Sequence, residues 1–267
     1  MNFQTVSVGQ KDVDPILSCA RNTSSGCDPS YVPGGYQPGS LAFTPQMTGA
    51  VKSVDAAIGS MVSELQKTGQ MDSTQIIITA KHGQSPIDPS KLAKIGHAET
   101  TVLANAGVNP AVVTDDDGAL VWLEDHRQTR QAVNALNADQ NGANTAHIQY
   151  VLSGNALADR FNSPTSDPRT PDVIVQPIPG TIYTTSAAKV AEHGGFAVDD
   201  THVAMLVVNG KDMRQGHRDS AGRVGGSVVN TPVRTYQVAP TILQNLGLNP
   251  RQLDSVRTEG VQVLPTP

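Results

Sequence analysis

Two His-Gly dipeptides are the residues of this chain best suited to chemistry. His82-Gly83 follows an apolar run that ends at Ala80, and His193-Gly194 precedes another that begins near Val203. Imidazole is the commonest side-chain metal ligand, and a glycine beside it lets the backbone approach a bound group closely. Two such loops can face one cation. The alternative for each histidine is a simple loop hydrogen bond to a carbonyl group.

The elements before the first His-Gly place it at the end of a strand. Apolar residues recur every three or four positions over residues 48–68, which predicts an amphipathic helix that ends at Gly69. The β-branched run from Gln75 to Ala80 predicts a buried strand. In open α/β sheets, ligands bind at the carboxyl ends of such strands.

The middle of the chain, residues 98–170, changes character and predicts a small α+β insert. It contains expected strands at 111–114, 120–123 and 147–152 and an expected helix at 128–136. The acidic turn at 115–118 lacks the spacing of a calcium loop, so we expect a solvated hairpin turn. Further strands are expected at 172–175 and 203–208, and a helix at 235–247.

Composition sets limits on the class of protein. The chain has 267 residues, enough for one large domain, and its 38% hydrophobic content is enough for a core. A formal charge of −5 with 16% charged residues argues against a dedicated nucleic-acid binder. No apolar run approaches the roughly 20 residues that a membrane span needs, so we expect a soluble globular protein. The first ten residues do not have the pattern of a signal peptide, a helix cap or a hairpin.

Several isolated residues have open or simple interpretations. Cys19 and Cys27 form a disulfide or remain two thiols, and the pair favours an exported protein, periplasmic or extracellular. A zinc site there is disfavoured because no histidine lies nearby. Four histidines in polar segments are expected to be solvated: His97, His126, His147 and His217.

Four segments in a fixed order resemble a known family. They are residues 79–86, 192–206, 237–248 and 259–265, together with 54–59 in the first helix. In this order they resemble the C-terminal part of the alkaline phosphatase superfamily, in its type I phosphodiesterase/nucleotide pyrophosphatase branch. The resemblance implies an α/β fold with a mostly parallel central sheet covered by helices on both faces.

The resemblance also implies a domain organisation. Residues 1–97 and 171–267 would form a partial alkaline-phosphatase-like domain, and residues 98–170 would be the inserted α+β excursion. The N-terminal half of the family domain, which carries the nucleophile and a metal-binding Asp, would be absent from this chain.

The chemistry implied by the resemblance is phosphoryl transfer at divalent metals, usually zinc. Two cations stabilise the attacking and leaving oxygens of an in-line displacement, while a Thr or Ser nucleophile forms a covalent intermediate that water hydrolyses. His82 matches a ligand of one ion and His193 a ligand of the other. The expected substrate is a small phosphoester such as a nucleotide.

The chain departs from the family pattern at three points. Lys81 stands where the family has Asp, and an ammonium group cannot bind a cation; it contacts phosphoryl or sulfuryl oxygens, or it pairs with Asp88 or Asp199. The family's Asp-x-x-x-His motif has no counterpart, and Gln10 stands nearest to its His. No Ser or Thr matches the nucleophile motif.

We therefore expect a metal-dependent hydrolase of phosphoric esters, with one or two divalent ions held by His82 and His193 and zinc as the expected metal. Lys81 would supply positive charge at the site. Two alternatives remain open. One is a non-catalytic or truncated family member that acts as a binding scaffold, and the other is a one-metal sulfatase-like hydrolase suggested by Lys81.

Overall fold

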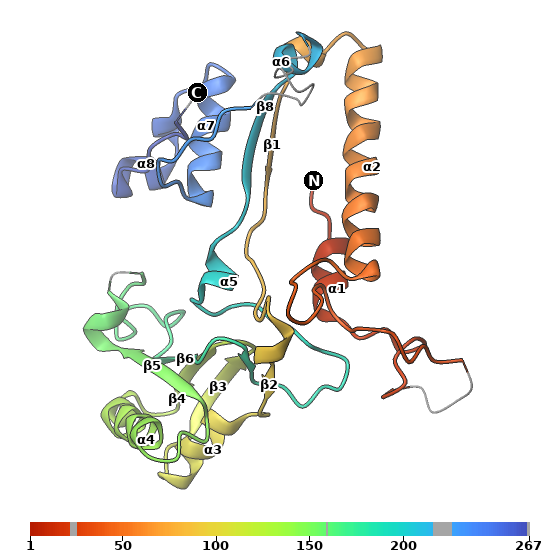
Figure 1. The fold of residues 1–267 in the computed structure, drawn as a ribbon. Coiled ribbons are helices and arrows are strands. Elements are labelled where there is room, and N and C mark those ends of the chain that lie inside the picture. Colours follow the sequence, from red (N-terminus) through yellow and green to blue (C-terminus); the bar gives the residue numbers. More distant parts are fainter. Residues whose placement is uncertain (22–25, 159, 216–225, 266–267) are drawn as a thin grey trace. The chain divides into compact units, whose positions relative to one another are not determined.

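The computed structural model describes residues 1–21, 26–158, 160–215 and 226–265 (Figure 1). The chain forms two compact units. The first contains residues 1–56 and 82–202, and the second contains residues 57–81 and 203–267.

The first unit contains a four-stranded sheet in the order β3-β4-β6-β5. Its strands are β3 (Pro110–Asp115), β4 (Ala119–Leu123), β5 (Ile148–Ser153) and β6 (Val173–Pro177). All three pairings are antiparallel. A short turn joins β3 to β4, and a turn of this length can connect only antiparallel neighbours.

Two helices cover this sheet and complete its core. They are α3 (Ala98–Asn105) and α4 (Thr129–Asn141), which lie beside the sheet in Figure 1. Alternate residues of β4 are buried, and α4 buries Ala132 and Leu136, one helical turn apart. The two helices and the strands β4, β5 and β6 thus share one hydrophobic core, which includes Leu103, Val121, Leu136, Ile148 and Val173, and the half-buried Val113 of β3 packs against it.

The rest of the first unit is irregular chain with short elements. They are α1 (Thr5–Lys11), the first part of α2 (Pro45–Lys67), the parallel pair β2 (Ala93–Lys94) and β7 (Thr181–Ile182), α5 (Val198–Thr201), and 3-10 turns at Pro89–Lys91, His126–Gln128 and Gly154–Leu157. Cys19 and Cys27 form a disulfide, which resolves the alternative that the sequence left open.

The second unit is built on an antiparallel ribbon. Strand β1 (Gln75–Thr79) pairs with β8 (Met205–Asn209), with Ile77 opposite Val207. The helical segments of this unit are the rest of α2, α6 (Gly210–Gln215), α7 (Val238–Asn245), α8 (Asp254–Glu259) and 3-10 turns at Met71–Ser73, Thr235–Gln237 and Pro250–Gln252. None of the described helices is long and apolar enough to cross a membrane.

The mixed α/β class agrees with the expectation, but a mostly parallel central sheet is not confirmed. The sheets formed by the described residues are small and mostly antiparallel. The apolar run at 76–78 was interpreted as a strand buried on both faces, yet these residues are only half-buried and their ribbon partners Leu206 and Val207 are exposed. The assignment of residues 98–170 as an insert stays a prediction, because compact units report packing and not the origin of a segment.

The shared core gives a direct stability prediction. Val121 is fully buried in β4, whereas Val112 in the neighbouring strand β3 is 54% exposed. Val121→Ala removes two buried methyl groups and should lower the free energy of unfolding by about 2 kcal/mol, as measured by urea denaturation. Val112→Ala is the matched control and should change it by less than about 0.5 kcal/mol. Equal effects would contradict the assignment of this core.

Candidate functional site

The two His-Gly loops lie side by side in the first unit. Backbone hydrogen bonds join Ser85 to Glu192 in both directions, at 2.8 and 2.9 Å. This short bridge brings the imidazoles of His82 and His193 together, with ring centroids 3.9 Å apart and planes inclined by 34°. Two histidines 111 positions apart in the sequence therefore share one location.

Both imidazoles are set up to act as acceptors. His82 Nδ1 lies 2.7 Å from the carbonyl oxygen of Gly83, so Nδ1 donates and the lone pair resides on Nε2. Burial lowers the pKa of His193, and the charge of the nearby His82 lowers it further. Both effects favour the neutral form of His193. Neutral imidazoles with a fixed tautomer are the form that binds metal ions.

The glycines of these loops allow neighbouring backbone to approach. A Cβ at Gly83 would collide with the carbonyl oxygen of Asp199 in α5, and one at Gly195 would lie 2.6 Å from the carbonyl oxygen of Asp117. Gly194 adopts a φ of 121°, which side chains disfavour. The loops are therefore held against α5 and against the turn between β3 and β4.

That turn was expected to be solvated, and the structure shows otherwise. Asp117 is buried, and its carboxylate accepts a 2.7 Å hydrogen bond from the Gly195 amide. The turn packs against the second His-Gly loop, so it contributes a carboxyl group to the site. Sequence patterning missed this because a hairpin turn is exposed unless another segment covers it.

Asp200 of α5 is the second buried carboxyl group beside the loops. Both of its oxygens, and Oδ2 of Asp117, have no hydrogen-bond partner, although the two side chains are neighbours. Burial and the adjacent Asp117 raise the pKa of Asp200 to about 9. The pair is therefore best satisfied by one shared proton that bridges the two carboxyl groups.

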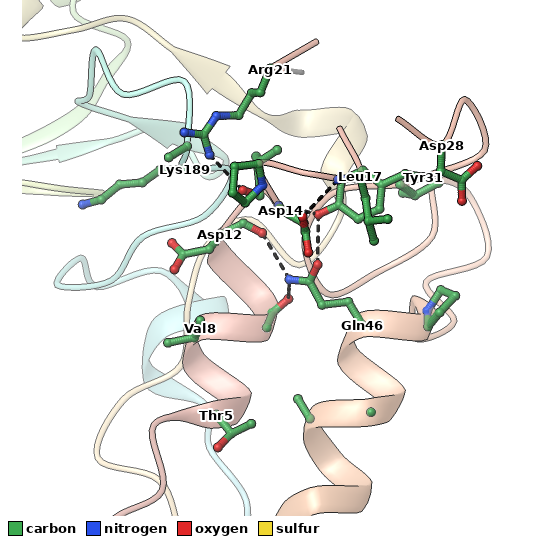
Figure 2. Close-up of a pocket in the computed structure, with 18 of the residues that line it drawn as sticks. Thr5, Val8, Asp12, Asp14, Leu17, Arg21, Asp28, Tyr31, Gln46 and Lys189 are labelled. Carbon is green, nitrogen blue, oxygen red and sulfur yellow. Dashed lines mark hydrogen bonds between the residues drawn. The ribbon is translucent and has the colours of Figure 1, made fainter. Parts of the chain in front are cut away.

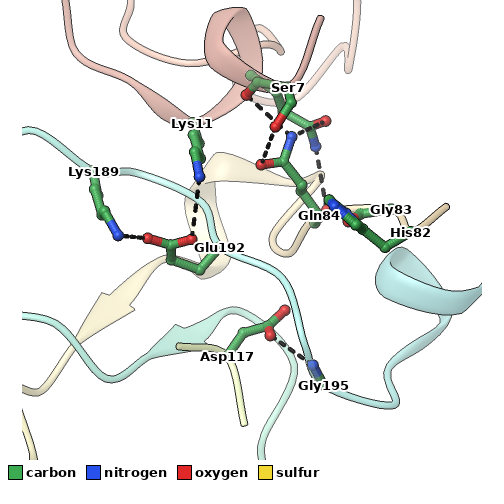
Figure 3. A network of polar contacts seen from close by, with 10 residues as sticks. Ser7, Lys11, His82, Gly83, Gln84, Asp117, Lys189, Glu192 and Gly195 are labelled. Carbon is green, nitrogen blue, oxygen red and sulfur yellow. Dashed lines mark hydrogen bonds and ion pairs between the residues drawn. The ribbon is translucent and has the colours of Figure 1, made fainter. Parts of the chain in front are cut away.

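Glu192, which precedes His193, is buried and neutralised by two lysines (Figure 3). Lys11 Nζ lies 3.7 Å from one carboxylate oxygen, and Lys189 forms an ion pair with the other. Burial and the charge of Glu192 raise the pKa of the nearby Asp116 to about 6. The lysines thus hold the loop that carries His193.

Helix α1 is fastened to the His82 loop by glutamines. Gln10 Nε2 donates to the Gln84 carbonyl oxygen and Gln84 Nε2 donates to Gln10 Oε1, both at 3.2 Å, while Ser7 Oγ donates to Gln84 Oε1 (Figure 3). In the sequence, Gln10 is identified only as the residue that stands nearest to the position of a family histidine. The helix that presents it was not expected.

A cavity of about 860 Å³ lies beside α1 and the start of α2 (Figure 2). Gln46 crosses it and donates to the carbonyl oxygens of Gly9 and Asp12, at 3.0 and 3.2 Å. Tyr31 donates to Gln46 Oε1 at 2.9 Å. Lys189 lines the cavity and also pairs with Glu192, so this lysine connects the cavity to the loop that carries His193.

The predicted site residues fall into two groups. His82 and His193 are brought together, whereas Lys81 is an exposed residue of the second unit. Its two predicted partners make other hydrogen bonds: Asp88 accepts from the Ser90 amide and Asp199 from the Ile87 amide. The roles of Lys81, His82 and His193 stay predictions.

The histidine pair fits a metal in ligand type but supplies only part of a coordination shell. Among the residues that the structure describes, three ligand atoms lie within 4.8 Å of one another at His97, Glu99 and Asp115, and not at His82 and His193. The pair can therefore supply two imidazole ligands to an ion, but the described residues do not place a third ligand atom together with both of them.

The histidines expected to be solvated have specific partners. His97 Nδ1 lies 2.5 Å from Asp115 Oδ2, and His126 Nδ1 lies 2.6 Å from Asp172 Oδ1, although both imidazoles are 57% exposed. His147 contacts Thr181, and His217 lies outside the described residues. These partners come from distant segments, so no local pattern reveals them.

The raised pKa of Asp200 predicts an effect of pH on stability. From pH 4 to 9 the unfolded chain releases this proton and the folded chain keeps it, so stability falls as pH rises, by at most about 1.4 kcal/mol per pH unit. Asp200→Asn cannot ionise and should gain stability relative to the unmodified chain as pH rises. Urea denaturation in chelator at several pH values measures this.

Asp14→Asn provides a control of opposite sign. The amides of Leu17 and Ile16 lower the pKa of Asp14, so its carboxylate stabilises the fold above pH 4 and that contribution is lost in acid. This variant should therefore lose stability relative to the unmodified chain as pH rises from acid. A stability difference for Asp200→Asn that is constant with pH would contradict the shared proton.

Three comparisons relate the chain to known proteins. A sequence profile of the type I phosphodiesterase/nucleotide pyrophosphatase family matches residues 35–201. A search of curated proteins finds no match. Solved structures that match include human ectonucleotide pyrophosphatase/phosphodiesterase 5, with 14% identity and a TM-score of 0.46 over 72% of this chain.

The match covers 54% of that human chain, so the present chain spans about half of its length. The family profile covers well over half of the present sequence and includes both His82 and His193. The family expected from the sequence is thereby confirmed: the chain belongs to the type I phosphodiesterase/nucleotide pyrophosphatase family.

Proposed function

We propose that this chain carries part of the site of a metal-dependent phosphoric-ester hydrolase, in which His82 and His193 bind one or two divalent ions, with zinc as the expected metal. The observation that carries the proposal is the 3.9 Å approach of two imidazoles from distant loops. Membership of a phosphodiesterase family supports phosphoester chemistry. We expect the substrate to be a small phosphoester of the nucleotide type.

A bound divalent ion would polarise a phosphoryl oxygen and stabilise the charge that develops during displacement. The residues of this chain would fix the ligands. The hydrogen bond from Nδ1 of His82 to Gly83 leaves Nε2 as the nitrogen that can bind an ion, and the buried Glu192 with its two lysines anchors the backbone beside His193. Asp117 fixes the loop on its other side by accepting from Gly195.

Lys81 remains our candidate for positive charge at the phosphoryl oxygens, because it directly precedes His82 in the chain. An ammonium group acts on an anionic substrate as a compact point charge. No serine or threonine of the chain is assigned as the nucleophile.

A second candidate function is a non-catalytic scaffold. It is favoured by Lys81, which stands where the family has a metal-binding Asp. It is also favoured because, among the described residues, the two imidazoles belong to no group of three ligand atoms that lie within 4.8 Å of one another. The sulfatase-like alternative predicts cleavage of aryl sulfates. Hydrolysis of a phosphodiester, of an aryl sulfate, or of neither separates the three possibilities.

The experiment uses the whole chain after zinc loading and dialysis. Elemental analysis should show zinc that is reduced in both His82→Ala and His193→Ala. Hydrolysis of bis(4-nitrophenyl) phosphate should fall by roughly 100-fold or more in each variant, because metal ligands affect the reaction at least as strongly as the groups that orient them. Turnover of 4-nitrophenyl sulfate, measured in parallel, tests the sulfatase alternative.

His126→Ala is the control variant, since His126 is another histidine of the same unit, pairs with Asp172 and lies away from the two loops in the sequence. It should retain zinc and activity. If His82→Ala and His193→Ala bind as much zinc as the unmodified chain, the metal role of the pair is wrong. Zinc bound at the pair without hydrolysis of either ester would favour the scaffold.

A further inference from the structure

A second group of possible metal ligands lies at the junction of α3 and β3. His97 directly precedes α3, Glu99 lies in the first turn of this helix, and Asp115 is the last residue of β3. One ligand atom from each residue lies within 4.8 Å of the other two. The segments are adjacent in space because α3 and β3 pack around the same hydrophobic core.

Glu99 is the residue that makes this group more than a cluster of surface charges. Its side chain is completely buried, and its Oε1 accepts a 2.9 Å hydrogen bond from the Thr100 hydroxyl. Its Oε2 has no hydrogen-bond partner. A buried carboxylate oxygen without a donor or a cation carries a large desolvation cost, so a missing partner is expected at this place.

We propose that His97, Glu99 and Asp115 bind a divalent transition-metal ion. One imidazole with two carboxylates matches the nitrogen and oxygen ligands of zinc, whereas magnesium and calcium favour oxygen ligands alone. Zinc bonds of roughly 2.0–2.2 Å place two ligand atoms about 3–4 Å apart, so small side-chain shifts would complete the shell. Three protein ligands leave a fourth position for water.

The ion would fix the turn that reaches the candidate site. Asp115 is followed by Asp116, whose carbonyl oxygen accepts from the Tyr183 amide, and by Asp117, which accepts from Gly195. An ion on Asp115 would join α3 to the first residue of this turn. The inference does not depend on the proposed function of His82 and His193, since no ligand is shared.

The competing explanation is a proton shared between Glu99 and Asp115, which would give Oε2 of Glu99 a hydrogen bond without any metal. A matched pair elsewhere helps to separate the two. His126 and Asp172 repeat the imidazole–carboxylate contact, with the same 57% exposure of the imidazole. This pair is not part of any group of three ligand atoms among the described residues.

The test uses the full chain with His82→Ala and His193→Ala, which removes the other proposed metal ligands. After zinc loading and dialysis, elemental analysis should find about one equivalent per chain, as expected for one site with three protein ligands. Adding Glu99→Gln, which keeps the side-chain size, should abolish this zinc. Adding His97→Asn should do the same, and adding His126→Asn should leave it unchanged.

Circular dichroism checks that each variant folds. His97 is 57% exposed, so His97→Asn decides the question even where Glu99→Gln does not fold. A folded double variant without zinc would overturn the proposal and favour the shared proton. Zinc retained in full by a folded His97→Asn variant would also overturn it.

Discussion

Burial of carboxyl groups is the constraint on which the first unit of this protein depends. Glu99, Asp117, Asp172, Glu192 and Asp200 are all nearly inaccessible to water. An ionised carboxylate is stable in such surroundings only when a cation, a proton or several hydrogen-bond donors accompany it. The arrangement of loops around the candidate site follows from how each of these groups is satisfied.

The solutions differ from one group to the next. Two lysines neutralise Glu192, and His126 together with the Leu123 amide satisfies Asp172. Asp117 accepts from the Gly195 amide, and its other oxygen has no donor; burial and Asp117 raise the pKa of the neighbouring Asp200, which favours one proton shared by the two carboxyl groups. Oε2 of Glu99 has no hydrogen-bond donor, which is why we propose Glu99 as a metal ligand.

The acidic turn at 115–118 connects these solutions. Its first residue contacts His97, its second carries a pKa raised to about 6 by burial and by Glu192, and its third holds the loop of His193. Substitutions in this turn would therefore affect the position of His193 without touching it. The two His-Gly loops are thus held by α1, α5 and this turn.

Local sequence patterns predict the helices and strands whose formation depends on the spacing of their own apolar residues. The 3.6-residue periodicity over 48–68 predicts α2. The strands expected at 111–114, 120–123 and 147–152 appear as β3, β4 and β5, because residues of each pack on a shared core. Patterns failed where distant segments decide, as in helix α1, the burial of Asp117, and the partners of His97 and His126. The parallel sheet came from the family resemblance, and an apolar run alone cannot fix strand direction.

The pairing of His82 with His193 rests on the bridge between Ser85 and Glu192, and its use as a metal site is the central claim. Crystals of the zinc-loaded chain, measured on both sides of the zinc absorption edge, test it most directly. We expect an anomalous peak about 2.1 Å from an imidazole nitrogen of His82 or His193. Zinc peaks elsewhere, with both of these rings bare, would contradict it.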